Sequence, residues 1–398
     1  GTYITTPSVN EKFAKVNVRT KVVLPEGADP AKYSVETSVW NPNKQKLTAV
    51  RTSLAQMKYN NNQAEQEFVI QAPSLWSPEM PALYSAETRL YEGDKLKDIY
   101  TTPFGIRSIE IIPDKGFFLN GKRTVFKGVC NHHDLGPLGA AVNDAAIRRQ
   151  IRILKDMGCN AIRTSHNMPA PELIRACDEM GMMIMAESFD EWNVAKCKNG
   201  YNLLFDEWAE KDLVNLLHNF RNNPSVVMWC IGNEVPNQWN EGDCKIAKWL
   251  QDICHREDPT RPVTQGMDAP DAVVNNNFAA VMDVAGFNYR PFKYKINYKK
   301  LPQRIVLGSE TASTVSSRGV YKFPVERKAM AKYDDHQASS YDVEHCGWSN
   351  LPEDDFIQHE DLPYCIGEFV WTGFDYLGEP TPYLSLIHIS EPTRRSPI

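Results

Sequence analysis

From about residue 116 onward, apolar segments alternate with helix-like segments, and this alternation restricts the possible folds more than any other feature of the sequence. In the first unit, the apolar segment 124–130 is followed by isoleucines and a leucine at helical spacing, and Gly158 ends the predicted helix. The predicted strands are residues 124–130, 160–164, 182–187, 226–232, 262–265, 284–288, 305–308 and 364–371, and further helices are predicted at 171–180 and 207–221. Eight strands over about 250 residues match the size of a (β/α)₈ TIM barrel. A doubly wound sheet is the weaker alternative, because eight regular units exceed its usual number.

The first 108 residues carry a different pattern, in which short alternating segments are separated by turn-rich stretches such as PEGADP and NPNKQ. The clearest of these segments are residues 15–23, 33–39, 66–70 and 84–91. Seven or so strands in about 100 residues are typical of an immunoglobulin-like β-sandwich. We therefore predict a multidomain β plus α/β protein, with a sandwich over residues 1–108 and a barrel over residues 109–383.

The charge distribution limits the possible partners. The 398 residues include 50 acidic and 44 basic side chains, for a net charge of −6, and neither sign forms a long run. Nucleic acid and anionic membranes both require a basic patch, and no stretch approaches the roughly 20 apolar residues that span a bilayer. We therefore expect no nucleic acid and no membrane as partner.

The nine cysteines form neither a CxxC pair nor a zinc-type spacing, which leaves the cellular compartment open.

Functional side chains follow the predicted barrel strands, at the rim where the catalytic groups of such barrels lie. Asn233 and Glu234 end the fourth strand, and Glu310 ends the seventh, on the opposite side of the barrel. Two carboxylates that face each other across a pocket can hydrolyse a glycosidic bond, and a retaining enzyme holds them about 5–5.5 Å apart. A single Glu among 50 acidic residues is usually a surface charge, so only the pairing favours catalysis. The remaining candidates at these strand ends are Asn131, His132, His133, Asp134, Arg163, Ser165, His166, Asn167, Glu187, Asp190, Glu191, Trp192, Asn288, Tyr289, Trp371 and Asp375.

The contexts of both glutamates resemble those of glycoside hydrolase family 2. RNNPSVVMWCIGNE (221–234) resembles the acid/base signature of this family, and LGSETAS (307–313) resembles its nucleophile strand. The segments LWSPEMPALY (75–84), FGIRSIE (104–110) and FFLNGKRTVFKGVCNHHD (117–134) are similar to its passage from sandwich to barrel, and DMGCNAIRTSHN (156–167) is similar to its second barrel strand. The resemblance covers about residues 1–383. It implies an immunoglobulin-like domain, a catalytic barrel and exo-acting, retaining hydrolysis of β-glycosides.

The resemblance also implies catalytic roles for individual residues. By position, Glu234 is the acid/base and Glu310 is the nucleophile. Asn233 would hold the 2-hydroxyl of the sugar, a contact that strengthens in the transition state. Tyr289 would donate a hydrogen bond to the nucleophile carboxylate. Arg163 is either a substrate ligand or a buried counter-ion of the carboxylates.

A second group of residues is expected to contact the sugar. His132, His166 and Trp371 match substrate-contacting positions of the β-galactosidases of this family, and Asn167 is a further candidate at the same rim. The indole of Trp371 offers a flat apolar face to the C–H groups of a sugar, but the ring is also suited to closing the barrel core. A histidine at a strand end is often a structural group instead. Weaker candidates for the pocket or for outer subsites are His133, Asp134, Trp192, Trp239 and Trp348.

The magnesium site of some relatives is incomplete in this sequence. Those relatives bind the ion through a Glu and a His just after strand three, together with the acid/base Glu. Glu191 matches the first ligand, but Asn193 stands where the His would be. Magnesium requires near-ideal oxygen geometry, so we expect no metal and no other cofactor. A second departure is Ser313, where several β-galactosidases carry a His just past the nucleophile.

The segments around strands seven and eight indicate the sugar. GSETASTVSSRGVY (308–321) and GEFVWTGFDYLGEPTPY (367–383) resemble one bacterial β-galactosidase subgroup of the family. We therefore expect a terminal β-galactose on an oligosaccharide or glycoconjugate as the substrate. β-Glucuronidases typically have the sequence SEYGA at the nucleophile strand, and β-mannosidases carry extra carboxylates after the GNE-like motif. Both activities remain alternatives. A carbohydrate-binding protein without catalysis is an alternative of a different class, which the retained pair of glutamates disfavours.

The last segment, LSLIHISEPTRRSPI (384–398), does not continue the family pattern and resembles translated sequencing-adapter sequence. We expect this tail to be non-native. The resemblance also predicts that the eighth barrel helix and an N-terminal sugar-binding domain lie outside the chain, which would leave it poorly stable and weakly active. It allows a homo-oligomer of the full-length protein and favours a periplasmic or secreted bacterial location.

Overall fold

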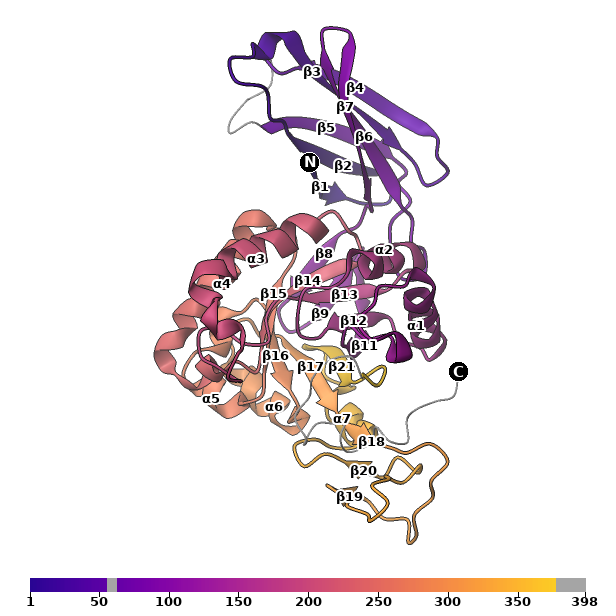
Figure 1. The fold of residues 1–398 in the computed structure, drawn as a ribbon, viewed down its shortest axis with the longest axis vertical. Helices are drawn as coiled ribbons and strands as arrows, with labels where there is room; N and C mark the ends of the chain where they lie inside the picture. Colours follow the sequence, from indigo (N-terminus) through magenta and orange to yellow (C-terminus); the bar gives the residue numbers. More distant parts are fainter. Residues whose placement is uncertain (56–62, 377–398) are drawn as a thin grey trace.

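The computed structural model describes residues 1–55 and 63–376, which form a β-sandwich stacked on a barrel (Figure 1). The sandwich lies at the end of the barrel where the strands begin, and a small lobe projects from the opposite end (Figure 1). The predicted non-native tail at 384–398 and the position expected for an eighth helix lie outside the described residues.

In the described part of the chain, seven antiparallel strands make up the sandwich. One sheet has the order β1-β2-β5 and the other has the order β4-β3-β6-β7. The strands are β1 (Thr2–Val9), β2 (Phe13–Lys21), β3 (Tyr33–Trp40), β4 (Lys46–Ser53), β5 (Gln63–Gln71), β6 (Tyr84–Glu92) and β7 (Lys95–Phe104). Less and more exposed residues alternate along β2 and β5, because one face of each strand packs into the interior, where Val16, Val18 and Phe68 form part of the core. The predicted two-sheet sandwich is confirmed.

Parallel strands close into a barrel in sequence order. They are β11 (Phe126–Asn131), β12 (Ala161–Thr164), β13 (Met183–Glu187), β14 (Val226–Asn233), β15 (Val263–Met267), β16 (Ala285–Asn288), β17 (Val306–Ala312) and β21 (Cys365–Trp371). β21 pairs with both β17 and β11, which completes the ring. Each predicted barrel strand corresponds to one of these, so the predicted TIM barrel is confirmed. Two strands run at least two residues further than predicted, since β15 ends at Met267 and β17 ends at Ala312.

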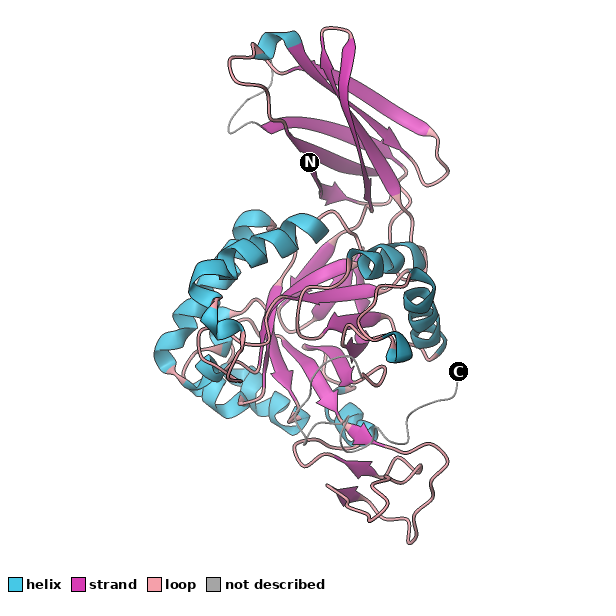
Figure 2. Ribbon diagram, in the orientation of Figure 1, coloured by secondary structure: helices cyan, strands magenta, loops and turns pink. Residues whose placement is uncertain are grey.

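Helices cover the outside of the barrel (Figure 2). They are α1 (Asp144–Asp156), α2 (Pro171–Met180), α3 (Phe205–Phe220), α4 (Cys244–Glu257), α5 (Pro270–Asn275), α6 (Tyr294–Asn297) and α7 (Pro352–His359). The side chain of Asn143 caps the first turn of α1, and Ile147, Ile151 and Leu154 pack into the core. α2 ends at Gly181, whose left-handed backbone closes the helix as predicted. Short 3-10 helices occupy loops at Pro30–Lys32, Gly136–Leu138, Tyr201–Leu203, Pro236–Trp239, Glu241–Asp243, Ala279–Val281, Pro291–Lys293 and Tyr298–Lys300.

A small sheet closes the base of the barrel beneath the sandwich. It consists of β8 (Ile109–Ile112), β9 (Gly116–Leu119) and β10 (Lys122–Thr124), in the order β10-β9-β8. The ring of Phe126 lies 4.7 Å from that of Phe117 and 5.6 Å from that of Phe369, measured between centroids. These aromatic contacts exclude water from the end of the barrel that is opposite the candidate site.

Buried polar groups join the sandwich to the barrel. The Tyr3 hydroxyl donates to Asp258 Oδ1 at 2.7 Å, and the same carboxylate accepts from Trp229 Nε1 at 3.0 Å and Arg261 Nη1 at 2.6 Å. Arg107 is also buried and donates to two backbone carbonyls at the start of β14. The sandwich is therefore held to the barrel by specific hydrogen bonds as well as by apolar contact.

A lobe that was not predicted from the sequence follows β17 at residues 314–350. Its sheet has the order β18-β20-β19, with β18 (Thr314–Val315), β19 (Lys328–Ala329) and β20 (Glu344–His345). Strands of two residues show no periodicity in a sequence, which explains why the prediction missed them. The N–H of Cys346 donates to the Ser313 carbonyl at 3.1 Å and anchors the lobe to the end of β17.

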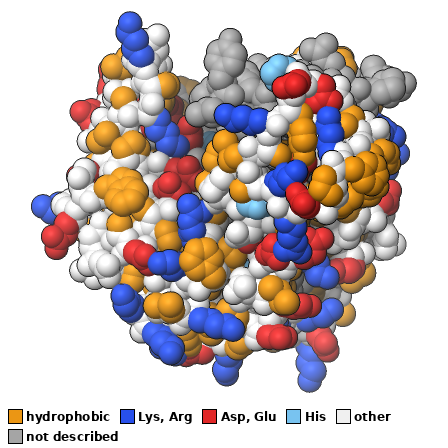
Figure 3. Space-filling view, turned by 90° about the horizontal axis from the view of Figure 1, so that it is seen from below, with side chains coloured by type: hydrophobic (Ala, Val, Ile, Leu, Met, Phe, Trp, Pro, Cys, Tyr) orange, Lys and Arg blue, Asp and Glu red, His pale blue; other side chains and the backbone are white. Residues whose placement is uncertain are grey.

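The surface does not concentrate charge of one sign on the face opposite the sandwich. Seen from below, acidic and basic side chains are interspersed over this face (Figure 3). This distribution agrees with the absence of long charge runs in the sequence. Among the helices of the described residues, none is long and apolar enough to cross a membrane.

Candidate active site

The strand ends opposite the sandwich surround a cavity of about 250 Å³, close to the lower end of the range for small-molecule sites, about 300 Å³. Its walls are His166, Asn233, Glu234, Asp268, Tyr289, Arg290, Glu310, Trp348, Trp371 and Tyr376. Six of the nine residues predicted for catalysis and substrate binding are among them. The remaining three, His132, Asn167 and Arg163, lie beside or beneath the cavity.

The carboxylates of Glu234 and Glu310 lie on either side of one amide group. Asn288 Nδ2 donates to Glu234 Oε1 at 2.8 Å and approaches Glu310 Oε2 at 3.5 Å. The separation of these two oxygens is therefore no greater than the sum of the two distances. That sum falls below the roughly 6.5–9.5 Å that inverting glycosidases keep between their carboxyl groups. The strand order of the barrel places β14 and β17 three strands apart, and the closed ring brings the two glutamates together at one rim.

Glu310 is held by donors that favour its ionised form. Tyr289 Oη donates to Oε1 at 2.7 Å, and Arg163 Nη1 donates to Oε2 at 3.0 Å. The Tyr289 hydroxyl also lies 2.7 Å from Ser313 Oγ. Burial raises the pKa of Glu310, whereas Arg163 and Tyr289 act in the opposite direction. The side chain thus has a fixed orientation and a compensated negative charge.

Glu234 has a different environment, which favours its protonated form. Burial, followed by the negative charges of Glu310 and Asp268, raises the pKa of Glu234 to about 7. The hydrogen bond from Asn288 and the charge of Lys196 oppose this effect. A carboxyl group with this pKa exchanges a proton readily near neutral pH.

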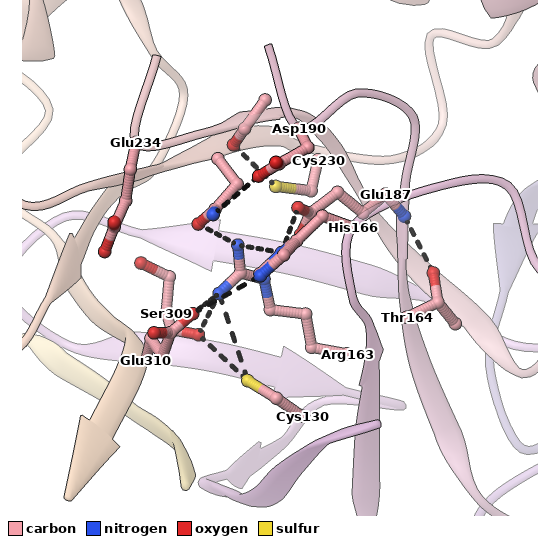
Figure 4. Close-up of polar contacts among 12 residues, drawn as sticks. Cys130, Arg163, Thr164, His166, Glu187, Asp190, Cys230, Glu234, Ser309 and Glu310 are labelled. Carbon is pink, nitrogen blue, oxygen red and sulfur yellow. Dashed lines mark hydrogen bonds and ion pairs between the residues drawn. The ribbon is translucent and has the colours of Figure 1, made fainter. Parts of the chain in front are cut away.

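Arg163 lies beneath the cavity, between Glu187 and Glu310 (Figure 4). Its side chain is fully buried, and it donates to the carbonyl of Ser309 at 2.9 Å and to Asn233 Oδ1 at 2.8 Å, in addition to both carboxylates. Arg163 does not line the cavity between Glu234 and Glu310. This position fits a buried counter-ion better than a direct sugar ligand, the two roles left open by the sequence.

His166 and Trp371 form one wall of the cavity. Their rings are stacked, with centroids 5.2 Å apart and an interplanar angle of 7°. His166 Nδ1 lies 2.8 Å from Glu187 Oε1, which orients the imidazole. His132 lies next to this wall. Its ring is edge-on to Trp371, with centroids 5.2 Å apart, and is stacked on Tyr376, with centroids 4.2 Å apart.

The other rim candidates lie outside this cavity. Asn167, His133 and Asp134 line a neighbouring cavity, where Asp134 Oδ1 accepts the Gly136 N–H at 2.7 Å. Trp192 is fully buried and donates to the Ile231 carbonyl at 2.8 Å, so it packs beneath its own loop. Trp239 is exposed and is not among the cavity walls. Of the tryptophans considered for outer subsites, Trp348 reaches the cavity.

Three cavity residues were not identified from the sequence: Asp268, Arg290 and Tyr376. Asp268 directly follows β15 and accepts a hydrogen bond from Gln238 Nε2 at 2.6 Å. The predicted strand stopped at residue 265, so extending it to Met267 would have placed Asp268 at a strand end. Arg290 follows Tyr289 in a left-handed conformation and donates to the Trp348 carbonyl.

The candidate magnesium ligands are already engaged by protein groups. The Glu191 carboxylate accepts the backbone N–H of Lys196 at 2.6 Å and of Asn202 at 2.8 Å. The Asn193 amide oxygen accepts from Asn237 Nδ2 at 2.8 Å. Within residues 1–55 and 63–376, no three His, Cys, Asp or Glu side chains are grouped so that they could hold a metal ion. These residues therefore do not fit the magnesium site of the relatives.

Comparison with known families and proteins gives consistent matches along the chain. Residues 110–385 match the model of the TIM barrel domain of glycosyl hydrolases family 2, and residues 2–107 match a second model of the same family. A β-galactosidase of Bacteroides ovatus, BoGH2A, is 37% identical over 96% of this chain. A β-glucuronidase of Bacteroides fragilis is 28% identical over 77% of the chain.

Solved structures and relative lengths complete the comparison. A β-glycosidase structure from Bacteroides vulgatus superimposes with a TM-score of 0.82 at 30% identity, covering 99% of this chain and 50% of that one. The chain spans 50% of the B. ovatus relative and 44% of the B. fragilis relative. It therefore corresponds to about half the length of the proteins that it matches.

Proposed function

This chain belongs to glycoside hydrolase family 2, and from that premise we propose that the cavity between Glu234 and Glu310 hydrolyses a β-glycoside with retention of configuration. Membership of this family implies a glycoside substrate. Because the chain spans about half the length of its relatives, the activity of the whole protein is part of the proposal. The observation that carries it is the pair of carboxylates on either side of Asn288 Nδ2, one with a pKa of about 7 and one compensated by Arg163 and Tyr289.

In the first step, Glu310 attacks the anomeric carbon of the sugar. A bond forms between this carbon and a carboxylate oxygen while the bond to the leaving oxygen breaks. Glu234 transfers its proton to that oxygen, so the aglycone departs as a neutral alcohol. The product is a covalent glycosyl ester of Glu310, and Glu234 is left as an anion.

In the second step, the anionic Glu234 accepts a proton from water. The oxygen of that water bonds to the anomeric carbon, and the ester bond to Glu310 breaks. Both glutamates return to their starting protonation states. Two inversions at the same carbon give net retention of configuration.

Further cavity residues are assigned to binding and orientation. Asn233, whose side chain is fixed by Arg163, Asn288 and Asp190, is assigned to the 2-hydroxyl. His166 and Trp371 offer a polar group and an apolar face to the sugar. No step is assigned to a metal, because Glu191 and its neighbours are engaged by backbone and amide groups.

We favour a terminal β-galactose as the sugar. The support is the 37% identity to a β-galactosidase across nearly the whole chain. A β-glucuronide is the second candidate, because the guanidinium of Arg290 in the cavity wall could bind a sugar carboxylate. The relative named as a β-glucuronidase also supports this candidate.

Hydrolysis of aryl β-galactoside, β-glucuronide and β-mannoside by the purified protein tests both the reaction and the sugar. We expect the highest kcat/KM for the galactoside. Replacing Glu310 by Gln should lower kcat by at least about 10⁴-fold, because an amide is a poor nucleophile. Glu241→Gln, which changes an exposed glutamate, is the control and should alter kcat by less than about twofold. Equal rates for Glu310→Gln and the parent protein would refute the nucleophile assignment, and galactose binding without hydrolysis would favour a binding protein.

A further inference from the structure

Both polar groups of the peptide between Asn233 and Glu234 are hydrogen-bonded. Glu234 has a positive φ of 42°, an uncommon conformation for a residue with a side chain, which persists only where its surroundings enforce it. Its N–H donates to the Gly266 carbonyl at 2.8 Å. The Asn233 carbonyl accepts from the ammonium of Lys196 at 2.9 Å. The direction of the Glu234 side chain therefore depends on Gly266 and on Lys196.

Lys196 also reaches Asn233 by a second route. Its ammonium donates to Asp190 Oδ1 at 2.8 Å, and Asp190 accepts from Asn233 Nδ2 at 3.0 Å. One cation thus holds the backbone of Asn233 directly and its side chain through a carboxylate. The Lys196 side chain is one quarter exposed and that of Asp190 is half exposed, and the contacts at 2.8 and 2.9 Å bring the ammonium charge close to the Asn233–Glu234 peptide.

The loop that carries Lys196 is shaped by the residue that matches a magnesium ligand of the relatives. Glu191 Oε2 accepts the backbone N–H of Lys196 at 2.6 Å, and Oε1 accepts the N–H of Asn202 at 2.8 Å. The carboxylate therefore folds the loop so that the lysine side chain can extend to the Asn233 carbonyl. In this chain Glu191 binds the loop that delivers a cation, whereas the family resemblance implies a direct magnesium ligand at this position.

We propose that Lys196 is the positioning residue of the acid/base Glu234, and that its ammonium supplies the local positive charge that a metal ion supplies in magnesium-binding relatives. The inference rests on the proposed function, since it requires Glu234 to act as the general acid. Lys196 touches neither the substrate nor the reacting atoms in this scheme. It acts through the Asn233–Glu234 peptide.

The leaving group of the substrate distinguishes this role from a purely structural one. The dinitrophenolate of a dinitrophenyl glycoside leaves with little help from a general acid. The phenolate of a phenyl glycoside is a poorer leaving group and needs a well-placed acid. We expect Lys196→Met to lower kcat/KM for the phenyl glycoside by roughly 30-fold and for the dinitrophenyl glycoside by less than about threefold. Lys196→Arg keeps the charge and should remain within about threefold of the parent protein on both substrates.

Lys198→Met is the matched control, because it removes the same charge from an exposed lysine of the same loop. It should leave both rates unchanged, and neither magnesium chloride nor a chelator should alter the rates of the parent protein. The glycone is whichever of galactose, glucuronate and mannose the parent hydrolyses fastest. Three results would overturn the role of Lys196 alone. The first is an equal loss of kcat/KM on both substrates in Lys196→Met, and the second is a loss in Lys196→Arg as large as in Lys196→Met. The third is activation of the parent protein by magnesium. A parent protein inactive on all three sugars would overturn the proposed function together with it.

Discussion

At the scale of single residues, Glu234 and Glu310 differ in what surrounds each carboxylate. Glu310 accepts hydrogen bonds from Tyr289 and Arg163, two donors that stabilise an anion. Glu234 has Asn288 as its donor and faces the negative charges of Glu310 and Asp268, with Lys196 as the opposing cation. Two side chains of identical chemistry therefore acquire the separate properties that an acid and a nucleophile need.

Asp268→Asn should move the basic limb of the pH profile of kcat/KM to lower pH. Glu234 must be protonated to act as an acid, so activity falls as the pH rises through its pKa of about 7. The Asp268 carboxylate raises that pKa, and removing its charge therefore lowers the pH at which the proton is lost. The profile measured over neutral and alkaline pH checks this shift. The control Asp252→Asn changes an exposed aspartate paired with Lys248, and an equal shift in that variant would contradict the prediction.

The residues that were predicted correctly as cavity residues are those at clear strand ends. Glu234 follows the apolar segment 226–232, and Glu310 comes two residues after the predicted strand 305–308, so their positions at strand ends placed both at the rim. Arg290 and Tyr376 had no such signal, because they reach the cavity through a left-handed turn and a loop after β21. His132 and Asn167 were expected in the cavity but lie beside it, because a strand end defines a rim without defining which way each side chain points.

At the scale of elements, the exit of strand β17, which carries the proposed nucleophile Glu310, depends on helix α7. Ala312 and Ser313 have positive φ values of 61° and 85°, which turn the chain sharply from β17 into the lobe. The N–H of Ala312 donates to Asp355 Oδ2 at 2.9 Å, and Asn350 donates to the other oxygen at 2.8 Å. A buried carboxylate of α7 thus holds the turn that begins two residues after Glu310.

Asp355→Ala should lower the free energy of unfolding by about 1–3 kcal/mol, because it leaves the buried Ala312 N–H without its acceptor. It should also lower kcat, since the strand end that carries Glu310 loses its support. Asp354→Ala is the control, because the adjacent carboxylate is exposed and pairs with Arg327 on the surface. That change should cost less than about 0.5 kcal/mol. Urea denaturation and steady-state kinetics measure both effects, and equal stabilities of the two variants would count against this role of Asp355.

The barrel strands were predictable for a physical reason that does not extend to the lobe. A parallel strand covered on both faces is apolar along its whole length, and β14 is buried at each of its eight residues. The two-residue strands of the lobe are specified by contacts between distant segments, such as Thr314 with His345. Only three-dimensional packing defines such elements, so local pattern could not reveal them.

At the scale of the whole molecule, the sandwich and the barrel share a polar junction. Tyr3 from β1 reaches Asp258, which is fixed from the barrel side by Trp229 and Arg261. The guanidinium of Arg221 lies over the Tyr3 ring, 4.2 Å from its centroid. These contacts come from segments more than two hundred residues apart in sequence, so they couple the stability of one domain to that of the other.

Tyr3→Phe should reduce the free energy of unfolding by about 1–2 kcal/mol, because Asp258 loses a donor in a buried site. Tyr33→Phe removes a longer hydrogen bond, 3.3 Å to Glu92, that lies within the sandwich, and it should cost less. Thermal unfolding followed by circular dichroism compares the two variants. A Tyr3→Phe protein as stable as the parent would show that the junction does not depend on this hydrogen bond.

The sandwich lies at the end of the barrel where the strands begin (Figure 1), whereas the cavity is lined by residues at the other ends of the strands. A protein fixed to a resin or an electrode through lysines on the outer strand β7, where Lys95 and Lys97 are exposed, would turn its open rim toward the flowing liquid. Substrate would then reach the rim without crossing the support. The same geometry makes that strand a convenient place for a dye or an affinity handle in a working reactor.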